Sequence, residues 1–407
     1  MNAPRHGRRL LVSAALLAAA TLPFGPTAAA EPAPAGELQL AGPTETAVPD
    51  SWIVVLKEPA AHRSVHELLA RADGARLGHV YRSALHGFSA RMSRAQAARL
   101  AADPRVARVH QDTRVTLEAP APVAPTATQP DAPWGLDRID QRLLPLSTTY
   151  TYRTTAAAVR VYVIDTGLRT THTEFGGRAS VGTDTVGDGQ NGNDCHGHGT
   201  HVGGIVAGRT YGVAKEARPV AVRVLNCQGS ASTSGVIAGV DWVTANAVRP
   251  AVANMSLGGA VSTALDAAVR GSIRAGITYT ASAGSSGRPD GACSTSPVRL
   301  PEIIGVGASD SQDRRASSSN YGNCVTLFAP GVGIPSAWKD GDSATATLSG
   351  TSAATAHTAG AAALHLALHP AATPGQVKQA LVTGATTGVL QGTPPVAPDR
   401  LLHTLYR

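Results

Sequence analysis

Ser349-Gly350-Thr351-Ser352-Ala353-Ala354-Thr355-Ala356-His357 is the stretch around which this chain is organised. A turn-forming Ser-Gly-Thr-Ser leads into an alanine- and leucine-rich run with few helix breakers, residues 354–368, which predicts a buried helix with Ser352 at its N-terminus. A hydroxyl at that point lies beside the unpaired N–H groups and the positive end of the helix dipole, which favours Ser352 as a nucleophile. The alternative is that Ser352 only caps the helix.

The N-terminus has the features of a secretory signal peptide. Arg5, Arg8 and Arg9 precede an apolar run, residues 10–20, and a small-residue cleavage site ends at Ala30. The apolar run is too short to span a bilayer, and no later stretch is long enough. We therefore expect residues 1–30 to be removed and the protein to be secreted, extracellular and not held in a membrane.

The charge and the cysteines narrow the class of protein. The 407 residues carry a formal net charge of +7, but from residue 127 onward 21 lysine and arginine residues accompany 18 acidic ones, with no basic cluster. This pattern argues against a nucleic-acid partner. Four cysteines in an exported chain favour two disulfides, and the lack of a C-x-x-C pair argues against zinc.

A small domain is expected between the leader and the rest of the chain. Residues 51–117 follow the order strand, helix, strand, strand, helix, strand, which is typical of a ferredoxin-like α+β domain. The strands are expected at 52–56, 80–83, 87–92 and 106–110, and the helices at 62–72 and 94–102. Such a domain is often a propeptide, and an ordinary accessory domain is the alternative. A Pro-, Ala- and Thr-rich linker, residues 119–133, follows it as a site for proteolysis.

Residues 127–407 alternate short β-branched runs with helical stretches. Strands are expected at 159–164, 219–225, 251–255, 277–280 and 303–306, and helices at 202–207, 234–243 and 263–275. The alternation predicts an α/β domain with a mostly parallel sheet covered on both faces. Functional groups are then expected at the carboxyl ends of the strands.

Three stretches of this domain supply the residue types that acyl transfer needs. Residues 161–167 end a buried strand on Asp165, residues 194–201 place histidines on a glycine turn before a helix, and Ser352 follows. In such chemistry the serine attacks, a histidine takes and returns its proton, and a carboxylate holds the histidine in the right tautomer. The chain order Asp, His, Ser is that of subtilisin.

On these residues the chain resembles the subtilisin-like serine proteases (peptidase S8 family), and within them the proteinase K and aqualysin-like branch. The likeness covers residues 127–407, and the matching segments are 134–142, 163–167, 198–202, 253–259 and 349–352. Residues 51–117 resemble the inhibitor I9-type propeptide of the same family. The resemblance implies a three-layer fold, a propeptide at 31–126 that inhibits its own enzyme, processing near Thr126–Ala127, a monomer, and protein or peptide substrates.

The resemblance also implies a role for individual residues. Asp165 would orient the ring of His198, the general base and acid, and Ser352 would be the nucleophile. His201 is expected to be structural, and His196 a surface histidine. A substrate peptide would lie as an added strand between two edge segments, and a third segment would line the pocket for the side chain before the cut. The three segments are Gly229, Ser230, Ala231; Ser256, Leu257, Gly258; and Ser282, Ala283, Gly284.

Of the three possible pairings of four cysteines, the resemblance selects Cys195–Cys227 and Cys293–Cys324. Closing each loop stabilises the fold by roughly 3 to 4 kcal/mol in the chain-entropy description.

Three positions near the nucleophile depart from the family pattern. Ser285 stands where relatives have an asparagine whose side chain donates to the oxyanion, which leaves the backbone N–H of Ser352 as the remaining donor. Ala353 replaces a methionine and Ala356 a proline. The leading interpretation is a secreted serine endopeptidase slowed or restricted by these changes. The alternatives are a pseudoprotease that binds peptides without efficient cleavage and an unrelated esterase, which lacks support because no G-x-S-x-G elbow surrounds Ser352.

Calcium is the cofactor that the resemblance implies, as a structural ion and not a catalytic metal. Asp137, Asp140 and Gln141 match ligands of one family site, and the carbonyls of Pro301 and Ile303 match those of another. Ser147 and Thr149 stand at ligand positions of the first site, and Thr326 replaces an aspartate at the second, so we expect weaker calcium dependence than in relatives. The carboxylates of Asp184, Asp188 and Asp194 are either a further ion site or solvated loop groups.

Overall fold

The computed structural model describes residues 36–42, 47–57, 62–81, 86–113 and 127–405. The chain forms two compact units that divide between Ala119 and Pro120. The expected signal peptide lies outside the described residues, as does Thr126 at the expected processing site. Among the described residues, no helix is both long and apolar enough to cross a membrane.

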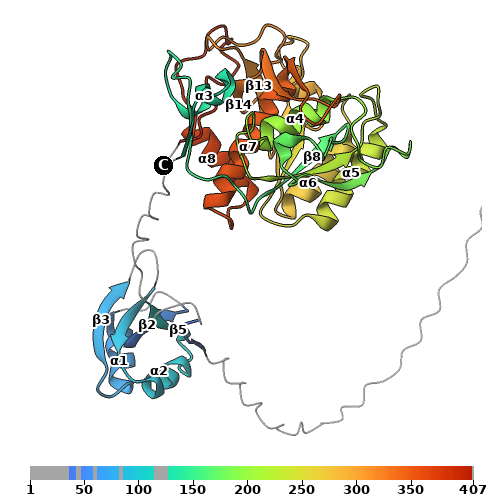
Figure 1. Cartoon of the computed structure of the whole chain (residues 1–407). Coiled ribbons are helices and arrows are strands. Elements are labelled where there is room, and N and C mark those ends of the chain that lie inside the picture. The colour runs from blue at the N-terminus through green and yellow to red at the C-terminus, as the bar shows by residue number, and fades with distance from the viewer. Residues whose placement is uncertain (1–35, 43–46, 58–61, 82–85, 114–126, 406–407) are drawn as a thin grey trace, which may run out of the picture. The chain divides into compact units, whose positions relative to one another are not determined.

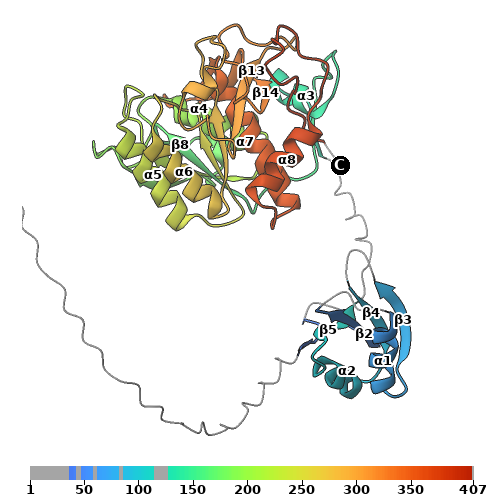
Figure 2. The ribbon, with the colours of Figure 1, turned by 180° about the vertical axis from the view of Figure 1, so that it is seen from behind.

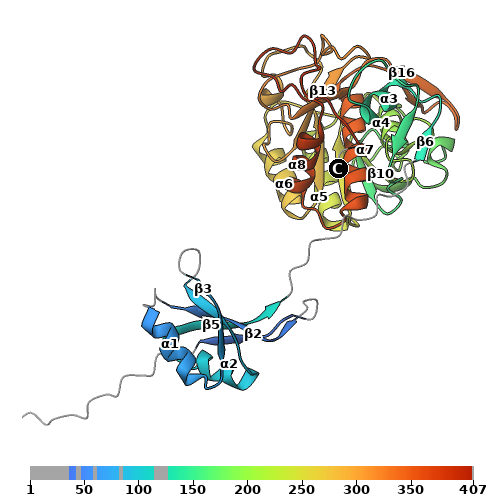
Figure 3. The same cartoon turned by 90° about the vertical axis from the view of Figure 1, so that its left-hand side faces the viewer.

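The N-terminal unit is an α+β domain built on a five-stranded sheet of order β1-β5-β2-β4-β3. Helices α1 and α2 lie on the same face of this sheet (Figure 3), where Leu68 and Leu100 pack against Val54, Phe88 and Val109. The expected ferredoxin-like order is confirmed, although the second strand begins earlier than expected, at Arg76. The elements are β1 (Glu37–Gln39), β2 (Ala47–Leu56), α1 (His62–Arg71), β3 (Arg76–Tyr81), β4 (Gly87–Arg91), α2 (Arg94–Ala101) and β5 (Val106–Thr113).

The C-terminal unit is organised around a parallel sheet of seven strands in the order β14-β13-β12-β11-β8-β10-β9 (Figure 1). Two further pairs, β6–β7 and β15–β16, are antiparallel. The predicted parallel sheet is therefore confirmed. The strands are β6 (Ala127–Gln129), β7 (Tyr150–Tyr152), β8 (Arg160–Asp165), β9 (Ser180–Asp184), β10 (Arg218–Arg223), β11 (Ala251–Met255), β12 (Thr278–Ser282), β13 (Ile304–Ser309), β14 (Leu327–Pro330), β15 (Ile334–Ala337) and β16 (Thr345–Leu348).

Helices cover both faces of the seven-stranded sheet. Along β8, Val161 and Val163 belong to one hydrophobic cluster, while Tyr162 and Ile164 belong to another, as expected for alternate side chains of a buried strand. The first cluster includes residues of α4, α7 and α8, and the second those of α5 and α6, which lie side by side (Figure 2). The helices are α3 (Trp134–Asp140), α4 (His198–Ala207), α5 (Thr233–Asn246), α6 (Thr263–Arg274), α7 (Thr351–Leu368) and α8 (Pro374–Gly384), with 3-10 turns η1 (Thr173–Phe175) and η2 (Ala292–Ser294).

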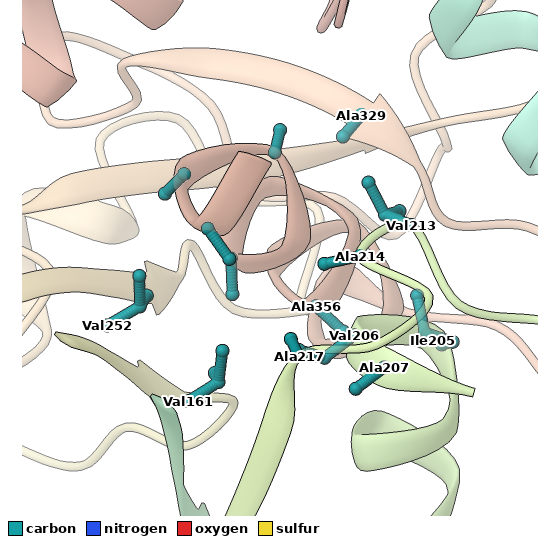
Figure 4. Packing of buried hydrophobic residues seen from close by; sticks show 14 of the residues in the cluster. Val161, Ile205, Val206, Ala207, Val213, Ala214, Ala217, Val252, Ala329 and Ala356 are labelled. Atoms are coloured by element: carbon teal, nitrogen blue, oxygen red, sulfur yellow. The ribbon is translucent and has the colours of Figure 1, made fainter. Parts of the chain in front are cut away.

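Helix α7 is enclosed on most of its circumference, which explains its small side chains. Figure 4 shows Ala356 among Val161 and Val252 of the sheet, Ala329 of β14 and Val206 of α4. A Cβ added to Gly360 would lie 2.5 Å from the Cβ of Val213, closer than real contacts allow. The alanine-rich composition that predicted this helix is thus what lets strands and a second helix approach it so closely.

Candidate active site

Strand β8 carries a buried carboxylate to the edge of the sheet. Its last residue, Asp165, has a fully buried side chain, whereas the ring of His198 is 22% exposed. Nδ1 of His198 lies 2.7 Å from Oδ1 of Asp165, and the backbone N–H of Thr166 donates to the same oxygen at 2.7 Å. Because a carboxylate at that distance accepts a hydrogen bond, Nδ1 carries a proton and Nε2 is left as the basic nitrogen.

The surroundings of His198 shift its proton affinity upward. Burial lowers the pKa of the imidazole, but the Asp165 carboxylate outweighs burial, with a smaller contribution from Asp194, so that the pKa lies above the ordinary value of 6.5. Burial instead lowers the pKa of His201 to about 4, and its Nε2 lies 3.0 Å from the carbonyl of Ile334. His201 is therefore neutral at neutral pH and tied to the backbone, as a structural histidine would be.

Asp194 holds the His198 turn against the end of β8. Its carboxylate accepts hydrogen bonds from the Thr166 hydroxyl at 2.8 Å, from the Thr200 hydroxyl at 2.7 Å, and from the N–H groups of His196, Gly197 and Thr200. These donors include N–H groups that the start of α4 would otherwise leave unpaired. Asp194 is thus neither a solvated loop group nor free to bind an ion.

Ser352 lies in the first turn of α7 but does not cap it. The N-cap is Gly350, and the interpretation of Ser352 as the capping residue is wrong, because its hydroxyl donates to the carbonyl of Ser256 at 3.1 Å. The Ser256 hydroxyl in turn donates to the carbonyl of Ser352 at 3.0 Å, and the side-chain N–H of Asn254 donates to Ser256 at 2.9 Å. Among the described residues no hydrogen bond joins Ser352 to His198.

A groove of about 520 Å³ runs beside His198. Both expected edge segments line it, 229–231 on one side and 256–258 on the other, and so do His196 and Thr166. His196, expected to be a surface histidine, thus faces the groove; its ring centroid lies 6.3 Å from that of His198. The third segment, 282–284, does not line this groove: Ser282 and Ala283 are buried at the end of β12.

Ser285 reaches Thr351, the residue before Ser352. Its Oγ accepts a hydrogen bond from the backbone N–H of Thr351 at 3.2 Å and lies 3.2 Å from the Thr351 hydroxyl. That hydroxyl also accepts from the N–H of Gly284 at 3.2 Å. The Ser285 hydroxyl is thus engaged with the turn that precedes Ser352.

Both disulfides that the resemblance implied are confirmed, and they use all four cysteines. Cys195–Cys227 joins the turn before His198 to the chain just before the edge segment 229–231. Cys293–Cys324 joins η2 to the segment before β14. The first disulfide therefore connects the histidine and one wall of the groove covalently.

The first group of expected calcium ligands fits a cation in part. Both oxygens of Asp137 accept hydrogen bonds from Ser147 and Thr148, and Gln141 Oε1 accepts one from Ser147. Oδ1 of Asp140, however, is buried without a hydrogen-bond partner. Burial, and secondarily the charge of Asp137, raises the pKa of Asp140 to about 6. A hard divalent cation would satisfy this oxygen and offset the repulsion between the two carboxylates.

The other two groups do not fit a metal ion, because side-chain cations already occupy them. The carbonyls of Pro301 and Ile303 each accept a hydrogen bond of 2.7 Å from the Lys378 ammonium, which corrects the expectation that they bind calcium. The fully buried Arg223 guanidinium pairs with Asp184 at 2.9 Å and with Asp188 at 2.6 Å. Both carboxylates are thus paired with a side-chain cation, although Asp188 is an exposed loop residue.

Sequence reasoning did not identify several residues that hold this arrangement together. Thr166 donates to Asp194 and accepts from the N–H of Gly199, and Asn254 supports Ser256 under Ser352. The only signal for them is their place beside Asp165 and at the end of β11. A Cβ on Gly199 would lie 2.2 Å from the carbonyl of Gly167, which shows how closely α4 approaches the turn after β8.

Comparisons with known protein families and sequences match nearly the whole chain. The sequence pattern of the subtilase family (Peptidase_S8) matches residues 156–398, and that of the peptidase inhibitor I9 family matches residues 51–118. The chain is 47% identical over 381 residues to the extracellular serine proteinase of Thermus sp. (strain Rt41A), covering 88% of this chain and 90% of that protein. It is 44% identical over 374 residues to alkaline serine exoprotease A of Vibrio alginolyticus, covering 89% and 69% respectively. A crystal structure of a cold adapted subtilisin-like serine proteinase superposes with a TM-score of 0.66 at 50% identity and covers 68% of this chain and 100% of that one.

Proposed function

The chain belongs to the subtilase family of serine proteases and carries an I9 inhibitor domain before its protease domain, and from this we propose that it is a secreted endopeptidase made as a zymogen. Ser352 is the nucleophile, His198 the general base and acid, and Asp165 the residue that orients His198. The observation that carries the proposal is the 2.7 Å hydrogen bond between Asp165 and Nδ1 of His198 at the edge of a peptide-sized groove.

Hydrolysis follows from the proton positions. With Nδ1–H donated to Asp165, Nε2 of His198 takes the proton of the Ser352 hydroxyl, which turns from the Ser256 carbonyl toward it. The serine oxygen forms a bond to the scissile carbonyl carbon, and the backbone N–H of Ser352 donates to the resulting oxyanion. His198 then gives its proton to the leaving amine. A water molecule, deprotonated by the same nitrogen, releases the acyl group and regenerates Ser352.

The groove supports an extended peptide as the substrate. Segments 229–231 and 256–258 both line it, and a peptide strand added beside them would be held through its main chain, which gives affinity without demanding a particular sequence. Segment 282–284 would then accommodate the side chain before the cut. The N-terminal unit acts as the inhibitor of the same chain until it is cut away near Thr126–Ala127, after residues 1–30 have directed export.

Covalent labelling tests the nucleophile. A sulfonyl fluoride should add one sulfonyl group to the purified protein, and peptide mapping should place it on Ser352, since only a serine activated by a base reacts in this way. The purified protein should hydrolyse both casein and a small peptide ester. Labelling without casein hydrolysis would contradict an endopeptidase, and no labelling at all would favour the pseudoprotease.

The pH dependence of kcat/KM should reflect the raised pKa of His198. The base must be neutral to accept the proton, so activity is lost as pH falls, about tenfold per unit below the pKa. Because the pKa lies above 6.5, the acidic limb should be centred above 6.5. A peptide substrate without ionisable groups keeps the profile free of substrate titration. A limb centred below 6.5 would contradict the assigned role of the Asp165 carboxylate.

Calcium is proposed as a structural ion at Asp137, Asp140 and Gln141. It would supply charge neutralisation and take no part in the reaction. Added calcium should raise the thermal unfolding midpoint of the chain. Asp140→Asn should remove most of that rise, because it deletes the charge of the carboxylate in this group whose Oδ1 is buried without a partner. The control is Asp399→Asn, a carboxylate bonded to backbone N–H groups of the loop at 388–390. An equal calcium response in Asp140→Asn and the parent would refute this site.

A further inference from the structure

We propose that the ammonium of Lys378 takes the place of a bound calcium ion at the carbonyls of Pro301 and Ile303, so that this part of the chain is stable without metal. Lys378 lies on α8, and its Nζ donates hydrogen bonds of 2.7 Å to both carbonyls, from residues 77 and 75 positions away in sequence. Carbonyl oxygens converging on one point are the usual ligands of a hard cation. Here the point is occupied by a cation that the chain supplies.

The net charge of the site supports the replacement of a calcium ion by the Lys378 ammonium. The family resemblance implies an aspartate at the position of Thr326, which would contribute one negative charge beside a divalent ion and leave one net positive charge. In this chain Lys378 contributes one positive charge and Thr326 none, so the site has the same net charge without a bound ion. Thr326 is buried and bonds to Gly305 through both its hydroxyl and its N–H. A neutral side chain at this position avoids a buried carboxylate that would lack a metal partner.

The charged residues around this site accommodate the Lys378 ammonium but no second cation. Burial lowers the pKa of Lys378 below its usual value, and the charge of Glu302, which lies between the two carbonyl residues and pairs with Arg270 at 2.8 Å, opposes this effect and favours the ammonium. On the other side, Arg400 lies 3.5 Å from the carbonyl of Thr326 and disfavours further positive charge. A divalent ion added beside the ammonium would meet both cations, so lysine and calcium exclude each other.

The contact has a structural role because it joins two elements. Lys378 connects α8 to the turn that leads into β13, the strand next to β12. When the ammonium is absent, two carbonyls lose a charged donor and the start of β13 loses its tie to α8. The amides of residues 300–309 should therefore report directly on whether a cation is present.

The test compares full-length chains that all carry Ser352→Ala to prevent self-digestion. The variants are Lys378→Met, which keeps an unbranched side chain one atom shorter and removes its charge, and Lys378→Met combined with Thr326→Asp. Lys339→Met is the matched control, since Lys339 forms an exposed pair with Asp340. Thermal unfolding and hydrogen exchange of residues 300–309 are measured with EDTA and with CaCl₂. Local exchange separates this site from any effect of calcium at Asp140.

In the parent, exchange of residues 300–309 should be the same with EDTA and with CaCl₂. Lys378→Met should lower the unfolding midpoint by about 4 °C and speed local exchange roughly tenfold, while Lys339→Met should change neither. The double variant should recover slow exchange with CaCl₂ only. If Lys378→Met does not fold, Lys378→Gln, which keeps the two N–H donors of its amide but no charge, replaces it with a smaller expected effect.

The proposal is overturned if CaCl₂ slows exchange of residues 300–309 in the parent, because the ion would then bind in spite of the ammonium. It is also overturned if neither lysine substitution changes that exchange. Both readouts are independent of proteolytic activity, so they hold even if the chain proves to be a pseudoprotease.

Discussion

Ser352→Ala should abolish processing and hydrolysis. Removal of the hydroxyl leaves His198 without a nucleophile to activate, and the same change in subtilisin, to which this chain is related, lowers kcat by about 10⁶-fold. The full-length variant should therefore keep residues 31–126 when it is refolded from denaturant without any other protease. The wild-type chain should lose them. Intact mass before and after refolding gives the result directly.

Two controls make this result specific to the hydroxyl. Ser318→Ala removes another serine hydroxyl at an exposed position and should process like the wild type. A trace of processed wild-type protein added to Ser352→Ala should cut it near Thr126–Ala127, which shows that the variant is folded and cleavable. Retention of the N-terminal unit by the wild type itself would give the pseudoprotease interpretation the lead.

Ser285→Asn should raise kcat by about 10²-fold, the reverse of the loss that follows removal of an oxyanion donor. In this chain the Ser285 hydroxyl lies 3.2 Å from both the N–H and the hydroxyl of Thr351. It is thus engaged with the turn before Ser352. An asparagine side chain is longer by one bond and ends in two N–H donors, so it can reach the oxyanion. Because the oxyanion exists only after attack, KM should change little.

The matched control is Ser286→Asn, the same substitution one residue further on. Ser286 donates to the side-chain oxygen of Asn320 and does not contact Thr351, so kcat should stay near the wild-type value. Steady-state kinetics on one peptide substrate compares the three proteins. An unchanged kcat in Ser285→Asn would show that the missing donor does not limit turnover and that another feature, such as Ala353 or Ala356, sets the rate.

The sequence predicted those elements whose pattern is local. Strand β11 was expected at the residues where it is found, and helix α7 follows from its alanine-rich run. Strand β9 was missed because it carries no buried residue, which leaves it without a hydrophobic pattern, whereas β11, of the same length, is buried throughout. Helix α8 was also missed, although Thr373, Pro374 and Gln376 form a capping box with a proline in the first turn. That signal was present in the sequence.

Parts of the candidate site could be predicted where a reactive residue type stands next to a predicted strand end or helix start. Asp165, the histidine-containing turn 194–201 and Ser352 were singled out because a carboxylate, histidines and a serine follow strand ends or precede helices, whereas the choice of His198 among the three histidines rested on the family resemblance. The contacts of Asp194 were not, because its partner Thr166 lies 28 residues earlier and meets it only in the folded sheet. The role of Lys378 was missed for the same reason, since no sequence spacing predicts that its ammonium binds a carbonyl 75 residues away.

The tight enclosure of helix α7 limits how this protein can evolve. Ala354, Ala359 and Ala362 have no exposed surface. Any larger residue there overpacks the interior, at about 1 to 3 kcal/mol. Selection for a folded chain alone would therefore keep these three positions small, in active and inactive descendants alike. Unchanged residues along this helix would therefore reflect packing and not activity. In a lineage that had lost proteolytic activity, substitutions would be expected at Ser285 or at Ser352 itself.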